Sequence, residues 1–215
     1  MIVPTRTRAG TLRSLLVAAV AFALFLLLGQ AVAHVPPGPL DRIAFGIVGS
    51  AFPLASALTT AGRFPSYVAV CIVVLVAGLV RRTLLRPALI SVVALILAWK
   101  TSDVFKDYFM RPRPTHWVGI HETSFSYASG HAALSLTFYG FWAYVAWTSA
   151  LPLRARVALV ALLVLFIGGI GWSRLALGAH YPSDVAGGYL FGAGFLALES
   201  LVYERIRSRA PIAPM

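Results

Sequence analysis

The chain has 215 residues, of which 59% are hydrophobic and only 12% carry a charge. A soluble domain of this length cannot bury so much apolar surface, so we expect lipid to be its solvent. The formal charge of +11 does not indicate nucleic-acid binding, because the cations lie mostly at the ends of apolar runs and form no basic stripe among exposed aromatics. Contact with an anionic lipid leaflet fits this charge better.

Six apolar segments follow one another along the chain, each close to the ~20 residues that cross a hydrocarbon core. They cover residues 15–33, 64–80, 87–105, 131–149, 157–174 and 185–203. We expect helices, because an open strand in lipid leaves its backbone groups unpaired. The sequence therefore predicts an all-α fold, an integral membrane bundle of six transmembrane helices, in one membrane-embedded domain over residues 1–215.

Two parts of this layout leave alternatives open. The basic start, the apolar run and Ala31-Val32-Ala33 resemble a signal peptide with its cleavage site, although the long apolar stretch favours a retained helix. Residues 34–63 are interrupted by Pro53 and Gly62. They fit an interfacial helix, a lid, or a plain packed loop.

Basic residues in the connections indicate the orientation of the bundle. One side of a six-helix path collects the arginines before the first helix, between the second and third, between the fourth and fifth, and after the sixth: Arg6, Arg8, Arg13, Arg81, Arg82, Arg86, Arg154, Arg156, Arg205, Arg207 and Arg209. By the positive-inside tendency this side, with both termini, is cytoplasmic. The opposite, outer side then holds Arg42, Arg63, Lys100, Lys106, Arg111, Arg113 and Arg174.

Three of the outer cations belong to short polar clusters. Lys106, Arg113 and Arg174 are costly beside hydrocarbon unless they meet negative charge or water. Two guanidinium groups and an ammonium match the peripheral oxygens of a phosphate through charge-assisted hydrogen bonds. For any one of them alone, snorkelling to lipid headgroups is the simpler explanation of the position. Arg111 has no specific role in this scheme, and we interpret it as snorkelling.

The second cluster, Ser129-Gly130-His131, precedes the fourth apolar segment. A helix N-terminus presents unpaired N–H groups and a positive dipole, which suits an anion. Ser129 can cap the helix or donate to a phosphate, and Gly130 allows close approach of the backbone.

The third cluster begins at Ser173-Arg174 and ends with His180 and Asp184. Pro182 suits the first turn of the sixth helix, and across this start the Asp184 carboxylate can reach the His180 imidazole. Such a contact fixes the tautomer and stabilises the imidazolium that forms when histidine attacks phosphorus. The rival is a metal site of His131, His180 and Asp184. The nearby cations would repel a metal ion.

The three clusters together resemble the signature motifs of the type 2 phosphatidic acid phosphatase (PAP2) superfamily of integral-membrane lipid phosphatases. The family pattern is Lys, six residues, Arg-Pro; then Pro-Ser-Gly-His; then Ser-Arg, five residues, His, three residues, Asp. The matching residues are Lys106, Arg113, Pro114, Ser129, Gly130, His131, Ser173, Arg174, His180 and Asp184. The one departure is Ala128, where the family usually has proline.

The resemblance implies a metal-independent hydrolase without a cofactor. His180 would attack the terminal phosphorus to give a phosphohistidine, Asp184 would orient it, and His131 would protonate the leaving oxygen and then help to activate water. The phosphate oxygens would be bound by Lys106, Arg113, Arg174, Ser129 and the Gly130 amide. Ser173 adds at most a hydrogen bond. Phosphoryl transfer depends mainly on such positioning and charge stabilisation.

The substrate would be a membrane lipid phosphate or diphosphate: undecaprenyl diphosphate, phosphatidylglycerophosphate or phosphatidic acid. A short chain without a soluble appendage resembles the bacterial enzymes, which implies the cytoplasmic (inner) membrane of a bacterium with the active site facing outward. Substrate entry between helices keeps the lipid tails in the bilayer. The oligomeric state is left open.

Two other functions compete with this one. A non-catalytic transporter or flippase would bind lipid phosphate with the same cations but needs no nucleophile or acid. Glu199, inside the sixth segment, favours such a pathway, although we interpret it as snorkelling. A third possibility is haloperoxidase chemistry, because vanadium haloperoxidases resemble this site. These enzymes are soluble, and the six apolar segments argue against that function.

Overall fold

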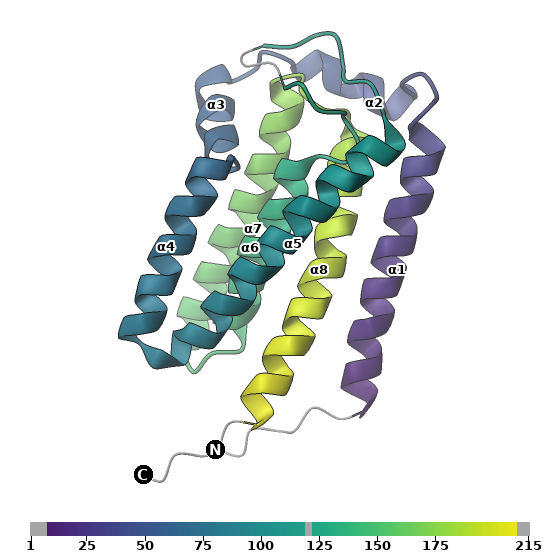
Figure 1. Ribbon diagram of the computed structural model, residues 1–215. Coiled ribbons are helices and arrows are strands. Elements are labelled where there is room, and N and C mark those ends of the chain that lie inside the picture. Colours follow the sequence, from purple (N-terminus) through teal and green to yellow (C-terminus); the bar gives the residue numbers. More distant parts are fainter. Residues whose placement is uncertain (1–7, 119–121, 210–215) are drawn as a thin grey trace.

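The computed structural model describes residues 8–118 and 122–209, and all regular elements in these ranges are helical. The long helices are α1 (Arg8–Val32), α4 (Phe64–Val80), α5 (Leu85–Phe109), α6 (Gly130–Trp147), α7 (Leu153–Ala176) and α8 (Pro182–Arg209). They run side by side as one bundle (Figure 1). Each of the six predicted segments overlaps one of these helices, so the all-α prediction is confirmed.

Within the described residues, four helical segments are long and apolar enough to cross a membrane: α1, α5 with the short η2 (Arg82–Leu84), α7 and α8. A fifth is added if two short helices joined by a bend count as one span, and α4 is a shorter apolar helix. Large apolar side chains such as Leu27, Val80 and Leu165 are exposed on the outside of the bundle. The protein is therefore a multi-pass membrane protein.

Residues 34–63 form short helices rather than a plain loop. They contain α2 (Pro39–Ile43), η1 (Ala44–Ile47) and α3 (Phe52–Ala61). The α2–η1 segment and α3 meet at an angle of 114°. These pieces lie at one end of the bundle (Figure 1) and pack against α7 and α8. The same end carries the three polar clusters.

Small residues let α6 and α8 approach closely next to the second cluster. A Cβ on Gly192 would lie 2.7 Å from the Ala133 carbonyl oxygen, and one on Gly188 would lie 2.5 Å from that of Ser129. Larger side chains are excluded at both positions, because the neighbouring backbone cannot move away. The start of α6, and with it Ser129, is thus held against the first turns of α8.

An aromatic cluster fixes the loop that leads into α6. The Tyr127 ring stacks on Phe25 of α1 with centroids 5.5 Å apart, and its hydroxyl donates a 2.6 Å hydrogen bond to the Phe25 carbonyl. Phe109, at the end of α5, meets Tyr127 edge to face. All three rings are buried. This packing anchors the loop between α5 and α6 to α1.

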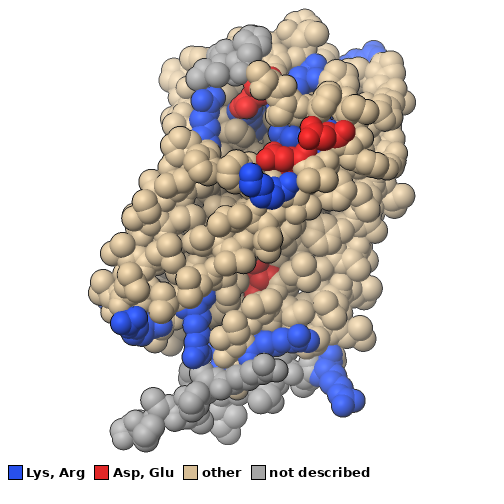
Figure 2. Space-filling view, in the orientation of Figure 1, with Lys and Arg blue, Asp and Glu red and all other residues tan. Residues whose placement is uncertain are grey.

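The connecting arginines and the polar clusters lie at opposite ends of the bundle. The described arginines of the predicted cytoplasmic side lie at or next to helix ends at the same end of the bundle. Figure 2 shows Lys and Arg gathered at this end. Arg6 lies outside the described residues. The clusters are at the other end, beside α2 and α3. The predicted separation of the two sets is therefore present in the fold.

The snorkelling interpretation of Glu199 is wrong. Its side chain is only 3% exposed, and within the described residues neither carboxyl oxygen has a hydrogen-bond partner. Helix α8 turns this position toward the interior of the bundle, so the side chain does not reach the membrane surface.

Candidate functional site

His180 lies in the short loop between α7 and α8, with its two ring nitrogens in different surroundings. Nε2 lies 3.1 Å from Nη1 of Arg113. Nδ1 lies 3.5 Å from Oδ2 of Asp184 and 3.3 Å from Oγ of Ser126. The predicted contact between His180 and Asp184 is present, and it joins the loop to the first turn of α8.

Asp184 is fully buried, and both of its carboxylate oxygens accept hydrogen bonds. Oδ2 accepts from Ser126 Oγ at 2.5 Å and from the Tyr181 N–H at 2.8 Å. The second bond is half of a capping box, because Asp184 at the third position of α8 reaches back to the residue before the helix. Oδ1 accepts from Arg111 Nη1 at 2.5 Å. The carboxylate is thus held rigidly beside the imidazole.

Ser124 joins the cations Lys106 and Arg113 by hydrogen bonds. Lys106 Nζ and Arg113 Nη2 each donate to the Ser124 hydroxyl at 3.1 Å, and Arg113 Nε donates to the Ser124 carbonyl at 2.6 Å. Arg113 Nη1 also donates to the Ala179 carbonyl at 3.0 Å. The end of α5 and the loop before His180 are therefore held together by hydrogen bonds.

Arg174 comes from the last turn of α7 and is 2% exposed. Its guanidinium donates to the Thr59 hydroxyl of α3 and, at 3.1 Å, to Oε1 of Glu122. Glu122 is the only partly exposed member of this ion pair, with 30% of its side chain accessible. A carboxylate therefore sits on a cation that a phosphate would also bind.

Several buried polar atoms near these cations have no hydrogen-bond partner within the described residues. They include Ser129 Oγ, His131 Nε2 and Arg174 Nε, all from motif residues. Ser129 precedes α6, but its side chain makes no capping bond. Leaving such groups unpaired is costly. Unpaired polar groups beside buried cations are what an anion-binding site requires.

Burial is the main cause that lowers the pKa of His180 well below 6.5, and the nearby charges of Arg113, Arg174 and Lys106 lower it further. The imidazole is therefore neutral at neutral pH. A neutral imidazole keeps the lone pair that a nucleophile needs.

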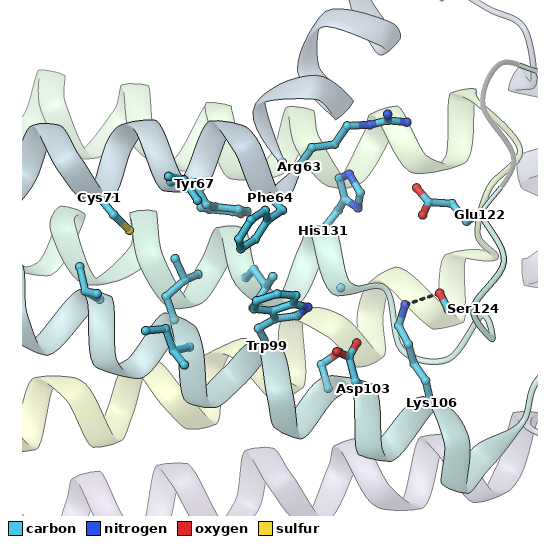
Figure 3. A pocket seen from close by; sticks show the side chains of 18 of the residues that line it. Arg63, Phe64, Tyr67, Cys71, Trp99, Asp103, Lys106, Glu122, Ser124 and His131 are labelled. Carbon is cyan, nitrogen blue, oxygen red and sulfur yellow. Dashed lines mark hydrogen bonds between the residues drawn. The ribbon is translucent and has the colours of Figure 1, made fainter.

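A cavity of about 760 Å³ leads from this site into the bundle between α4 and α5. Figure 3 shows Arg63, His131, Lys106 and Glu122 at its polar end, and Tyr67 and Cys71 toward its apolar end. Val68, Ile72 and Ile96 line the cavity and are also exposed on the outside of the bundle. The cavity thus connects the polar cluster with the lipid-facing surface.

Two assignments from the sequence need correction. Arg111 does not snorkel: it is 2% exposed and forms ion pairs with Asp184 at 2.5 Å and with Asp41 at 2.7 Å. Ser173 does not face the anion site, because its hydroxyl donates to the Ile170 carbonyl of its own helix at 2.6 Å. The first error arose because the partner Asp41 lies 70 residues away in sequence.

Sequence reasoning also missed three residues that the fold brings to the site. Ser126 bonds Asp184, and Asp41 bonds Arg111. Arg63, at the start of α4, lines the cavity and has a buried Nε without a partner in the described part of the chain. The sequence places Arg63 among the cations of the outer face, but it does not indicate that Arg63 lies beside His131. Ser126 and Asp41 carried no signal in spacing or composition.

The described ranges hold no group of three or more His, Cys, Asp or Glu side chains arranged to bind a metal ion. The nitrogen of His180 that would serve as a ligand instead faces the Arg113 guanidinium. A guanidinium beside this nitrogen favours an anion there over a metal ion.

Comparison with known proteins gives the family. The sequence model of the PAP2 superfamily matches residues 87–208. The chain belongs to the PAP2 superfamily. The matched region contains all ten motif residues, whereas Asp41 and Arg63 lie before it. The PAP2 resemblance deduced from the motifs is therefore confirmed.

Two curated relatives and one solved structure illustrate the similarity. A lipid A 1-phosphatase of Rhizobium etli is 36% identical over 120 residues, which are 53% of this chain and 49% of that protein. Phosphatidylglycerophosphatase B of Bacillus subtilis is 32% identical over 110 residues, 49% of this chain and 53% of that protein. The alignments thus span about half the length of these relatives.

The solved structure is a transmembrane PAP2-type phosphatidylglycerolphosphate phosphatase from Bacillus subtilis. It matches with a TM-score of 0.79 and 22% identity, covering 90% of this chain and 98% of that one. At this identity the match establishes the shared PAP2 membrane fold. It also extends beyond the region matched by the family model, to most of the bundle.

Proposed function

We propose that this PAP2 protein hydrolyses the phosphate or diphosphate of a membrane lipid, without a metal ion, through a phosphohistidine on His180. The observation that carries the proposal is the arrangement at His180. One ring nitrogen faces a carboxylate and the other faces a cluster of cations, where a phosphate would be bound. Pure binding of an anion requires the cations alone.

In the first step, the Nε2 lone pair of His180 attacks phosphorus, and the bond from phosphorus to the leaving lipid oxygen breaks. His131 gives that oxygen its proton, while Asp184 stabilises the positive charge that develops on the His180 ring. In the second step, water attacks the phosphohistidine and gives its proton to His131, which releases phosphate and restores His180. Asp184 keeps the ring in place through both steps.

The phosphate oxygens are bound by Lys106, Arg113, Arg174, Ser129 Oγ and the Gly130 amide. The unpaired buried Ser129 hydroxyl and Arg174 Nε support this set, as does the position of Gly130, where a Cβ would lie 4.0 Å from Lys106 Nζ. Arg63 adds a further cation from the start of α4. Fixed positive charges of this kind stabilise the transition state of phosphoryl transfer.

The substrate is a lipid whose tail lies in the cavity between α4 and α5 while its phosphate reaches the cations. The apolar lining of this cavity and its opening on the lipid-facing surface support lateral entry. Undecaprenyl diphosphate, phosphatidylglycerophosphate and phosphatidic acid all fit this chemistry. The names of the relatives, lipid A 1-phosphatase and phosphatidylglycerophosphatase B, support lipid phosphates as a class.

In the cell, we place the protein in the cytoplasmic membrane of a bacterium as a single domain with six crossings. Both termini are cytoplasmic and the site faces outward. The concentration of connecting arginines at the end away from the site supports this orientation.

The alternative is a transporter or flippase that binds the same headgroups without cleaving them. It is favoured by Glu199, a buried acid inside α8 without a partner in the described residues. Intramembrane acids of this kind often mark transport pathways.

The test is phosphate release from the three lipids by purified protein in detergent with EDTA, for wild type, His180→Ala and the control His34→Ala. His34 is exposed and far from the motifs in sequence. We expect release that survives EDTA, persists in His34→Ala and is lost in His180→Ala. Binding without release would favour the transporter, and loss of release in EDTA would favour a metal mechanism.

A further inference from the structure

Arg111 is a buried cation that the phosphate-binding set does not use. Its guanidinium is 2% exposed and lies over the Tyr181 ring at 4.5 Å. Nη1 donates to Asp184 and to the Ser183 hydroxyl, while Nη2 donates to Asp41. A buried charge of this kind is strongly destabilising unless it is paired. Here it is paired twice, and one partner is the carboxylate next to His180.

Asp41 approaches the same place from α2, outside the region that the PAP2 family model matches. It is 5% exposed. Its Oδ1 accepts from the Ser183 N–H at 3.0 Å and from the Ser183 hydroxyl at 2.7 Å. Ser183 directly precedes Asp184, so Asp41 holds both Arg111 and the first turn of α8 in place. An acid at this position also complements the helix dipole.

We propose that Asp41 is a positioning residue for the reaction, which acts on His180 through Arg111 and Asp184. This inference rests on the proposed function of His180. Arg111 shares its charge between two carboxylates, so the buried group of Asp41, Arg111 and Asp184 has a formal charge of −1. Without Asp41, Arg111 would pair with Asp184 alone and neutralise it. The negative potential that stabilises the His180 imidazolium would then be lost.

Loss of the Asp41 carboxylate would leave the other charges around His180 unchanged. They come from every element packed around the imidazole: Lys106 from α5, Arg113 from the loop after it, His131 from α6, Arg174 from α7 and Asp184 from α8. All except Asp184 are basic groups, which disfavour the imidazolium. The negative group is therefore the single opposing charge among these residues, alongside a hydrogen bond with the Ser126 backbone that also raises the pKa of His180. The charge of this group depends on Asp41.

The direct test is Asp41→Asn, which removes the charge but keeps the shape. We expect kcat to fall by about 10- to 100-fold, as for other losses of positioning, with KM changed by less than about twofold because the phosphate-binding cations are untouched. The acid limb of kcat/KM should move to lower pH, because the imidazolium is less stable. The matched control is Asp107→Asn, the same change at an exposed residue of α5, which should behave as wild type.

A second variant distinguishes the effect of the negative charge from the effect of the ion pair on the fold. Asp41→Asn combined with Arg111→Gln removes both charges and returns the group to −1, while Asp184 keeps its bonds from Ser126 and Tyr181. We expect this double variant to recover part of the kcat lost in Asp41→Asn. If the ion pair merely held the fold together, the double variant would be slower than Asp41→Asn, and this result would overturn the proposal.

A readout without substrate distinguishes failure of this inference from failure of the proposed function. Imidazole ¹⁵N shifts of His180, measured in micelles for wild type and Asp41→Asn, report its titration directly. We expect the midpoint to fall by about 0.5 pH unit on loss of the carboxylate. An unchanged midpoint together with unchanged kcat would refute the role of Asp41. Wild-type protein that titrates as expected but cleaves no lipid would refute the proposed function instead.

Discussion

Nε2 of His180 and Nη1 of Arg113 lie 3.1 Å apart. A guanidinium has only donors, so Nε2 must present its lone pair and the ring proton must sit on Nδ1. Nδ1 faces Asp184 and Ser126, which are both able to accept it. The nitrogen that points at the cations is therefore the nucleophilic one. Binding of phosphate would bring phosphorus to the side of the ring that carries the lone pair.

This tautomer can be observed. We expect the ¹⁵N spectrum of His180 to show a protonated Nδ1 and an unprotonated Nε2 at pH 7. Because burial and cations lower the pKa of His180 below 6.5, the same spectrum should persist at pH 6.5. The neutral ring stabilises the fold fully above 6.5, and this contribution is lost as the pH falls toward the lowered pKa. A proton on Nε2 would contradict the assignment.

Asp184→Asn tests the support of the nucleophile. The amide keeps the size of the side chain but loses the charge that fixes the tautomer and stabilises the imidazolium. We expect kcat to fall by about 10²- to 10⁴-fold, as for other carboxylates that orient a catalytic histidine, with little change in KM. A variant with wild-type kcat would show that the Asp184–His180 contact is unimportant for turnover.

Glu122→Gln tests competition for Arg174. Glu122 pairs with this cation at 3.1 Å and is partly exposed, so a phosphate must share or displace it. Removing the charge should lower KM by about two- to fivefold, the range of a partly exposed ion pair. The control is Glu204→Gln, which breaks the Glu204–Arg207 pair at the opposite end of the bundle. A higher KM in Glu122→Gln would mean that Glu122 helps to bind the substrate.

Arg63→Gln tests the cation that the motifs do not include. Its buried Nε lacks a partner in the described residues and its side chain lies at the polar end of the cavity (Figure 3). We expect KM to rise by about tenfold, since a charge-assisted hydrogen bond to phosphate is lost. Lys100→Gln removes an exposed cation from α5 and should leave KM unchanged. Equal KM values for Arg63→Gln and wild type would exclude Arg63 from the site.

Cys71 offers a test of the lipid path. It is the single cysteine of the chain and lines the cavity between α4 and α5. A long alkyl methanethiosulfonate should attach there and lower kcat/KM for a long-chain lipid by about tenfold through overfilling of the cavity. A short-chain soluble phosphate should be unaffected, and Cys71→Ser should resist the reagent. Equal inhibition of both substrates would argue against a tail-binding cavity.

The sequence predicts the parts of this fold that follow from local rules. Apolar length places the six long helices, and the motif spacing brings Lys106, Ser129 and His180 to one end of the bundle. The close contact of His180 with Asp184 follows from their separation of four residues at a helix start. The PAP2 assignment needs only these features.

Long-range pairing limits what the sequence predicts. The role of Arg111 depends on Asp41, whose segment shows no helical periodicity strong enough to fix its position. Arg63 reaches the site only because α3 and α4 meet at Gly62. Glu199 was misread because burial of an acid within α8 depends on how the neighbouring helices pack. Such contacts are decided by the tertiary structure.

The stereochemical course at phosphorus tests the central claim most directly. A lipid thiophosphate made chiral with ¹⁶O and ¹⁸O is hydrolysed by the wild-type protein in H₂¹⁷O, and the configuration of the released inorganic thiophosphate is determined. Attack by His180 followed by attack of water gives two inversions, so we expect retention of configuration. Inversion would mean that water attacks the lipid phosphate in a single step, and it would contradict a phosphohistidine on His180.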